Sequence, residues 1–166
     1  MTSSSTPEVF SAAVLTVSDS CASGQRKDLS GPAVAQLLTR NQFAVVFTEI
    51  VPDDQPAIEV AILRLCEKAK LVVTTGGTGV AERDVTPEAT RAVCSRFLDG
   101  VAERMRAEGE KKTPLASLSR GLCGVRGQCL VINVPGSPRG AVESLAAVID
   151  VLPHALRLLS GQTDHP

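Results

Sequence analysis

Short apolar runs, each followed by polar or glycine-rich residues, recur along this chain. Runs of about four to eight apolar and β-branched residues bounded by turn residues are typical of buried strands. They predict strands at Val9–Val17, Phe43–Val51, Leu71–Val73 and Cys129–Val134. A further short strand is expected at Leu122–Arg126, which Gly127 and Gln128 turn into the last one.

Between these runs, apolar residues recur at the three- and four-residue spacing of a helix face. The clearest stripe consists of Ile58, Ala61, Ile62, Leu65 and Ala69. Four other helices are predicted: Ser30 to about Asn41, Pro87 to about Phe97 with Thr86 as N-cap, Val101 to Ala107, and Ala141 to Leu159 with a bend at Pro153. Glu108–Ser119 lacks a period and is expected to be a long loop.

This alternation of strands and helices indicates the fold class. Strand–helix–strand units cross over right-handedly and build a mostly parallel sheet with helices on both faces. We therefore expect an α/β fold, a three-layer αβα sandwich. The 166 residues suit one such domain over 9–161, with a flexible Ser/Thr-rich tail at 1–8 and a C-terminal tail at 162–166.

Composition narrows the classes of function. The 17 basic and 18 acidic residues give a net charge of −1, which lacks the basic field of a nucleic-acid-binding domain. The chain has no Trp or Tyr on which bases could stack. It also has no apolar run near the roughly 18 residues of a membrane span and no secretory signal pattern. We expect a cytoplasmic protein with neither nucleic acid nor membrane as a partner.

The five cysteines are an odd number and include no C-x-x-C pair, which argues against a disulfide framework or a zinc site. We expect five free thiols.

A glycine-rich segment follows the predicted strand at Leu71–Val73. It contains Thr75, Gly76, Gly77, Thr78 and Gly79. Closely spaced glycines let backbone N–H groups approach an anion such as phosphate, although a tight strand-to-helix turn would need the same residues. Asp84 favours an anion-binding site over a simple turn. Thr86 is expected to cap the next helix, so the sequence does not need Asp84 for that role.

Polar or glycine clusters follow four of the predicted strands. They are Ser18 with Asp19, Asp53 with Asp54, the glycine-rich segment as far as Asp84, and Pro135 with Gly136 and Ser137. Ligands of parallel sheets bind outside the carboxyl ends of the strands, so four clusters on one edge predict a site. The simpler reading keeps Ser18 as a cap and lets one of the two adjacent acids cap the next helix.

Two carboxylates beside a phosphate loop favour a nucleotide reaction assisted by Mg²⁺, which is usually held by one or two carboxylates and substrate phosphates. Asp53 and Asp84 are the candidates. Ser119 and Arg120 could contact an anionic substrate, or Arg120 could be an ordinary solvated arginine. The chain has neither the lysine of a P-loop nor a G-x-G-x-x-G pattern.

The motifs TTGGTG and RDVTPEAT, with VPDD before them and LSRG and NVPGSPRG after them, resemble the molybdenum-cofactor biosynthesis family of the MogA and MoaB type. The resemblance extends over Val9–Gly161. It implies Mg²⁺-dependent transfer of AMP from ATP to molybdopterin with release of pyrophosphate. It also implies a homotrimer or a dimer of trimers, and a partner protein that inserts molybdate afterwards.

The resemblance assigns roles to individual residues. It implies that Asp53 and Asp84, the candidate Mg²⁺ ligands, are catalytic, and that Thr75–Gly79 is the nucleotide and phosphate loop. Other expected pocket residues are Ser18, Asp19, Ser119, Arg120, Pro135, Gly136 and Ser137. One stretch differs from the usual family sequence. Residues 99–103 read Asp-Gly-Val-Ala-Glu, where the family usually has Pro-Gly-Phe-Gly-Glu. The alternatives are a non-catalytic carrier or scaffold for molybdopterin, and a nucleotide-binding regulator.

Overall fold

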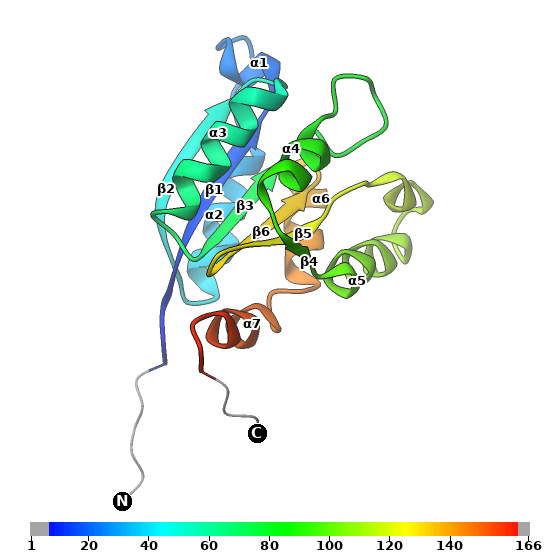
Figure 1. Ribbon diagram of the computed structural model, residues 1–166. Coiled ribbons are helices and arrows are strands. Elements are labelled where there is room, and N and C mark those ends of the chain that lie inside the picture. The colour runs from blue at the N-terminus through cyan, green and yellow to red at the C-terminus, as the bar shows by residue number, and fades with distance from the viewer. Residues whose placement is uncertain (1–6, 163–166) are drawn as a thin grey trace, which may run out of the picture.

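Six strands form one mixed sheet in the order β2-β1-β3-β6-β5-β4 (Figure 1). The strands are β1 Phe10–Val17, β2 Phe43–Val51, β3 Leu71–Thr75, β4 Arg96–Phe97, β5 Cys123–Arg126 and β6 Cys129–Val134. Neighbours among β2, β1, β3 and β6 are parallel, whereas β5 is antiparallel to both β6 and β4. The computed structural model describes residues 7–162, so the predicted tails at 1–8 and 162–166 lie mostly outside the described residues.

Helices cover both faces of this sheet. The helices are α1 Asp19–Ala22, α2 Ser30–Arg40, α3 Gln55–Cys66, α4 Thr86–Val93, α5 Asp99–Glu110, α6 Pro138–Ala146 and α7 Leu152–Leu159, with a 3₁₀ turn η1 at Pro114–Leu118. Residues of α2, α5, α6 and α7 pack with Val14 and Val73 in one apolar cluster. Residues of α3 and α4 pack with Leu15 and Val72 in the other, in front of the sheet in Figure 1. The predicted three-layer αβα sandwich is confirmed.

The central strands are buried along their whole length, which explains their continuous apolar sequence. Every residue of β3 and of β6 is buried. Strands covered on both faces lack the polar alternation of a half-exposed strand. In the described part of the chain, no helix is both long enough and apolar enough to cross a membrane. All five cysteines are free, as predicted.

Two predicted helices end or break earlier than the apolar spacing suggested. The helix predicted to reach Phe97 ends at Val93, because residues 96–97 pair with β5 as a strand. The helix predicted over 141–159 divides into α6 and α7. Pro153 lies in the first turn of α7, where its missing N–H costs nothing, whereas it would interrupt a continuous helix.

The predicted long loop at Glu108–Ser119 is also partly helical. The last turn of α5 extends to Glu110, and η1 occupies Pro114–Leu118. Thr113 caps η1 by accepting a hydrogen bond from the backbone N–H of Leu115 at 3.3 Å. A short 3₁₀ turn has no long period, so the hydrophobic pattern gave no sign of it.

Candidate active site

The carboxyl ends of β2, β1, β3 and β6 meet at one edge of the sheet, as their parallel pairing requires. A cavity of about 370 Å³ opens there, which we call the carboxylate cavity. Of the predicted site residues, its lining contains Ser18, Asp53, Thr75, Gly76, Gly77, Asp84, Gly136 and Ser137. Residues from four separate connections therefore surround one space.

A second cavity of about 460 Å³ adjoins the first, since Gly77, Asp84, Gly136 and Ser137 line both. We call it the leucine cavity, because the exposed Leu115 and Leu118 of η1 contribute to it. Its other predicted residues are Thr78, Gly79, Ser119 and Pro135. Among the residues that the structure describes, Asp19 and Arg120 are the two predicted site residues that line neither cavity.

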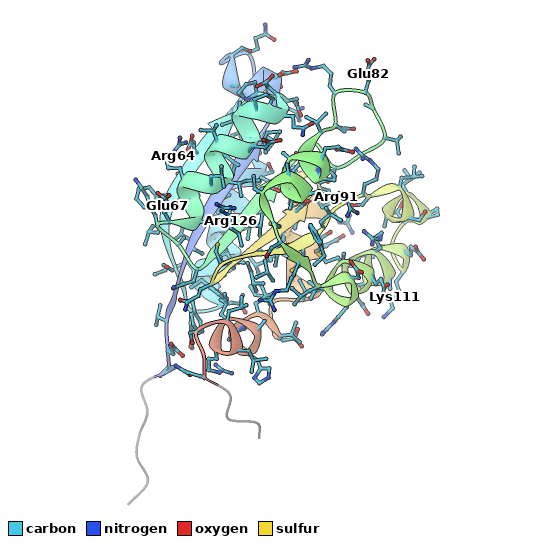
Figure 2. All side chains as sticks on the ribbon, viewed as in Figure 1. Arg64, Glu67, Glu82, Arg91, Lys111 and Arg126 are labelled. Atoms are coloured by element: carbon cyan, nitrogen blue, oxygen red, sulfur yellow. The ribbon has the colours of Figure 1, made fainter. Side chains whose placement is uncertain are left out.

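Glycine is required at the start of the glycine-rich loop, residues 76–84. Gly76 has a φ of 102°, and a Cβ there would lie 2.2 Å from the carbonyl oxygen of Val17. Gly77 has a φ of 67°, and its Cβ would lie 2.3 Å from Oγ1 of Thr86. Both positions combine a left-handed backbone with a close approach that excludes any side chain. The loop then projects from the molecule, with Glu82 on its projecting arch in Figure 2.

Thr86 is not the N-cap of α4, which corrects the prediction. Val85 occupies that position and makes no side-chain capping bond. Thr86 is fully buried, and its hydroxyl donates to the carbonyl of Gly76 at 2.9 Å while its N–H donates to the carbonyl of Gly77 at 3.1 Å. At a buried helix start, the nearest acceptors are the glycine carbonyls, so Thr86 fixes the loop rather than capping the helix.

Asp84 closes the loop from its far end. Its Oδ2 accepts a hydrogen bond from the N–H of Ala81 at 3.0 Å, and the same oxygen lies 2.8 Å from where a Cβ at Gly79 would be. The side chain is half-buried and lines both cavities. Asp84 is thus a carboxylate held at the junction of the two cavities.

Asp53 and Asp19 bind each other's backbone. The N–H of Asp19 donates to Oδ2 of Asp53 and the N–H of Asp53 donates to Oδ1 of Asp19, both at 2.9 Å. Asp54 caps α3 by accepting from the N–H of Ala57 at 3.0 Å, so one of the two adjacent acids is a cap, as the sequence suggested. The Oδ1 of Asp53 faces the glycine loop, 3.3 Å from the Cβ position of Gly77.

The electrostatics of Asp53 reflect this crowding. Burial raises the pKa of the Asp53 carboxyl above its ordinary value, the N–H of Asp19 opposes that rise, and the negative charges of Asp19 and Asp84 add to it. A cation placed between Asp53 and Asp84 would offset the repulsion between their two charges. The pair therefore fits Mg²⁺ held jointly by protein carboxylates and substrate phosphates. Residues 7–162 contain no group of three or more His, Cys, Asp or Glu side chains that could hold a metal ion without such help.

Asp19 lines neither cavity, and its carboxylate is bound by Arg83. The Nε and one terminal nitrogen of Arg83 donate to the two carboxylate oxygens of Asp19 at 2.6 and 2.9 Å. This hydrogen bonding lowers the pKa of Asp19. Ser18 caps α1 by accepting from the N–H of Cys21 at 3.2 Å, so it is both a cap and part of the cavity lining.

Arg120 binds the glycine-rich loop and the side chain of Glu88. Its Nε donates to the carbonyl of Gly79 at 2.8 Å and a terminal nitrogen donates to the carbonyl of Asp84 at 2.7 Å. Its backbone N–H donates to the carbonyl of Thr78 at 2.8 Å, and the other terminal nitrogen forms an ion pair with Glu88. The sequence suggested a substrate contact or a solvated side chain, and a direct contact with substrate stays a prediction. These contacts of Arg120 join residues 32 to 42 positions apart, which no local pattern could reveal.

Two features of the site have no clear signal in the sequence: a buried hub at Asn133 behind the loop, and a basic segment, Arg26 and Lys27, at the cavity mouth. The amide nitrogen of Asn133 donates to the hydroxyls of Thr74 and Thr90, each at 2.9 Å. Arg26 and Lys27 line the carboxylate cavity. The composition of their loop, small and charged, was the only signal for them.

Residues 13–154 match a family described as "Probable molybdopterin binding domain". The chain belongs to this family. The match contains both carboxylates, Asp53 and Asp84, and the whole glycine-rich loop, so the resemblance drawn from the motifs is confirmed.

Individual relatives are similar over nearly their whole length. The molybdopterin adenylyltransferase of Helicobacter pylori is 41% identical over 152 residues, which are 89% of this chain and 86% of that protein. The enzyme of the same name from Escherichia coli K12 is 36% identical and is covered to 84%. Among solved structures, the molybdopterin biosynthesis enzyme MoaB of Thermus thermophilus is 50% identical with a TM-score of 0.85, covering 92% of this chain and 97% of that one.

Proposed function

We propose that this protein is a molybdopterin adenylyltransferase, which transfers AMP from ATP to molybdopterin and releases pyrophosphate in molybdenum cofactor biosynthesis. One observation carries the proposal: Asp53 and Asp84 line a cavity together with a glycine loop whose backbone excludes side chains. The relatives named molybdopterin adenylyltransferase support it, because the similarity extends over 84–86% of their length.

The arrangement assigns a part of the reaction to each element. The backbone N–H groups of Gly77, Thr78 and Gly79 and the hydroxyl of Ser137, at the start of α6, offer donors to phosphate oxygens. Asp53 and Asp84 would hold Mg²⁺, which when bound neutralises charge on the phosphates and favours departure of pyrophosphate. An acceptor oxygen of molybdopterin attacks the α-phosphorus of ATP, and the bond between the α- and β-phosphates breaks.

The two adjoining cavities suit a reaction between two substrates. Both cavities are lined by Gly77, Asp84, Gly136 and Ser137. A substrate bound in one cavity would therefore meet a substrate bound in the other beside these residues. Holding two reactants side by side removes much of the entropic barrier to their reaction. Asp84 stands at this junction and is the residue best placed to act on the transferring phosphoryl group.

The departure from the family motif at residues 99–101 lies outside the lining of both cavities. The three residues form the first turn of α5, and none of them lines either cavity in the described part of the chain. This observation favours an active enzyme over a non-catalytic carrier.

The test is pyrophosphate release by the purified protein in the presence of ATP and molybdopterin. We expect release only when both substrates are present, with adenylylated molybdopterin as the second product. A carrier would bind molybdopterin without releasing pyrophosphate, and a nucleotide regulator would bind ATP without depending on the pterin. Either result would refute the proposed function.

Magnesium dependence is tested by titration calorimetry of ATP with and without EDTA. We expect much weaker binding in EDTA, because Asp53 and Asp84 then repel the triphosphate. Equal affinity in both conditions would exclude Mg²⁺ held by these carboxylates.

The assembly and the location of the protein complete the proposal. We propose a cytoplasmic homotrimer or dimer of trimers that passes its product to a molybdate-insertion partner. The resemblance of the sequence motifs to the MogA and MoaB type supports this view.

A further inference from the structure

Acidic side chains outnumber basic ones around the two cavities. Among the described lining residues, the acids are Asp28, Asp53, Asp84 and Glu143, and the only basic residues are Arg26 and Lys27. Both proposed substrates are anions, because ATP carries a triphosphate and molybdopterin carries a phosphate ester. Because the acidic side chains of the lining repel a phosphate, cationic groups are needed where the phosphate binds.

The other arginines near the loop are already paired. Arg83 is bonded to both oxygens of Asp19, and Arg120 is paired with Glu88 and bonded to loop carbonyls. Arg26 and Lys27 are exposed, and neither takes part in any of the ion pairs found within residues 7–162. Their charges are therefore available to a ligand.

The basic segment is anchored at both of its ends. The N–H of Arg26 donates to the carbonyl of Ser20 at 3.1 Å. On the other side, the carboxylate of Asp28 accepts from the hydroxyl of Thr16 at 2.7 Å and from the N–H of Gly31 at 3.0 Å. These bonds fix the backbone of the segment to α1, the end of β1 and the start of α2, so both side chains begin from a fixed position beside the cavity.

We propose that Arg26 and Lys27 bind a substrate phosphate at the mouth of the carboxylate cavity. The guanidinium of Arg26 can donate two parallel hydrogen bonds to phosphate oxygens, and Lys27 adds a mobile point charge. The proposal rests on the proposed function, which supplies two sources of this chemistry: the triphosphate of ATP and the phosphate ester of molybdopterin.

The experiment compares two double variants that lose the same charge. The test variant is Arg26→Gln with Lys27→Gln. The control is Arg40→Gln with Lys68→Gln. Arg40 is the last residue of α2 and Lys68 follows α3, and both are exposed. They lie at the amino ends of the strands, opposite the end that carries the cavities. Calorimetry measures the binding of ATP and of pyrophosphate at equilibrium, and the transfer assay measures KM for molybdopterin. Melting temperature confirms that each variant folds.

Loss of charge-assisted hydrogen bonds should weaken the affected ligand by roughly ten-fold or more. Weaker ATP and pyrophosphate binding with an unchanged KM for molybdopterin would support the proposal and assign the triphosphate. A raised KM for molybdopterin with unchanged ATP binding would support it and assign the pterin phosphate. No change in either, or equal losses in the control variant, would overturn it. A parent protein that binds ATP but transfers no AMP would instead refute the proposed function, while the calorimetric comparison still decides the role of Arg26 and Lys27.

Discussion

The guanidinium of Arg120 holds the glycine-rich loop through two of its carbonyl groups, those of Gly79 and Asp84. Arg120→Lys keeps the charge but cannot donate to both carbonyls and Glu88 in the same planar arrangement. We expect kcat to fall by roughly ten-fold, because Asp84 loses its position, with the KM for ATP little changed. The unfolding free energy should fall by about 1–3 kcal/mol.

The split between kcat and KM separates this role from substrate binding. An Arg120→Lys protein with normal kcat and a raised KM for ATP would show that Arg120 contacts the nucleotide, contrary to our account. Arg91→Lys is the matched control, since Arg91 lies on α4 over the ring of Phe97 and lines neither cavity in the described structure.

At the scale of elements, the sequence was sufficient to predict the parallel strands and the edge of the sheet on which the site lies. Apolar runs predicted β1, β3 and β6, and an alternating pattern predicted β2. Parallel pairing then placed Asp53 and the glycine-rich loop at one edge of the sheet. Local patterns could not show where α4 gives way to β4, because pairing with β5 decides that boundary. Nor could they show that Asn133 meets Thr74 and Thr90, since these contacts join residues 59 and 43 positions apart.

The Asn133 hub links three elements behind the loop, which are β3, β6 and α4. Asn133→Leu keeps a similar volume but leaves the N–H of Leu122, which donates to Oδ1 of Asn133 at 3.1 Å, without an acceptor. It also removes both amide donors. We expect the unfolding free energy to fall by about 2–4 kcal/mol, because each buried group left unpaired costs about 1–3 kcal/mol. Urea denaturation measures this loss. Asn41→Leu, at the exposed end of α2, is the control, and equal effects in the two variants would contradict the hub.

At the scale of the whole molecule, the edge strand β2 carries exposed apolar side chains. Val46, Phe47 and Ile50 are 41–45% exposed, and β2 has a neighbour on one side only. An apolar edge of this kind is uncommon on a monomer. We expect light scattering at micromolar concentration to give a multiple of the 17.4 kDa chain mass, with a trimer or hexamer as the family implies. A mass of one chain would contradict this prediction.

The rate of AMP transfer by Asp84→Asn tests the central claim most directly. The amide oxygen of Asn can still accept from the N–H of Ala81, so the loop keeps its shape while the charge at the cavity junction is lost. We predict a fall in rate of about 10²-fold or more, with melting temperature and molybdopterin binding nearly unchanged. Asp54→Asn is the control, because Asp54 caps α3 and lines neither cavity in the described structure. An Asp84→Asn protein that transfers AMP at the parent rate, or that fails to fold, would contradict the assignment of this edge as the active site.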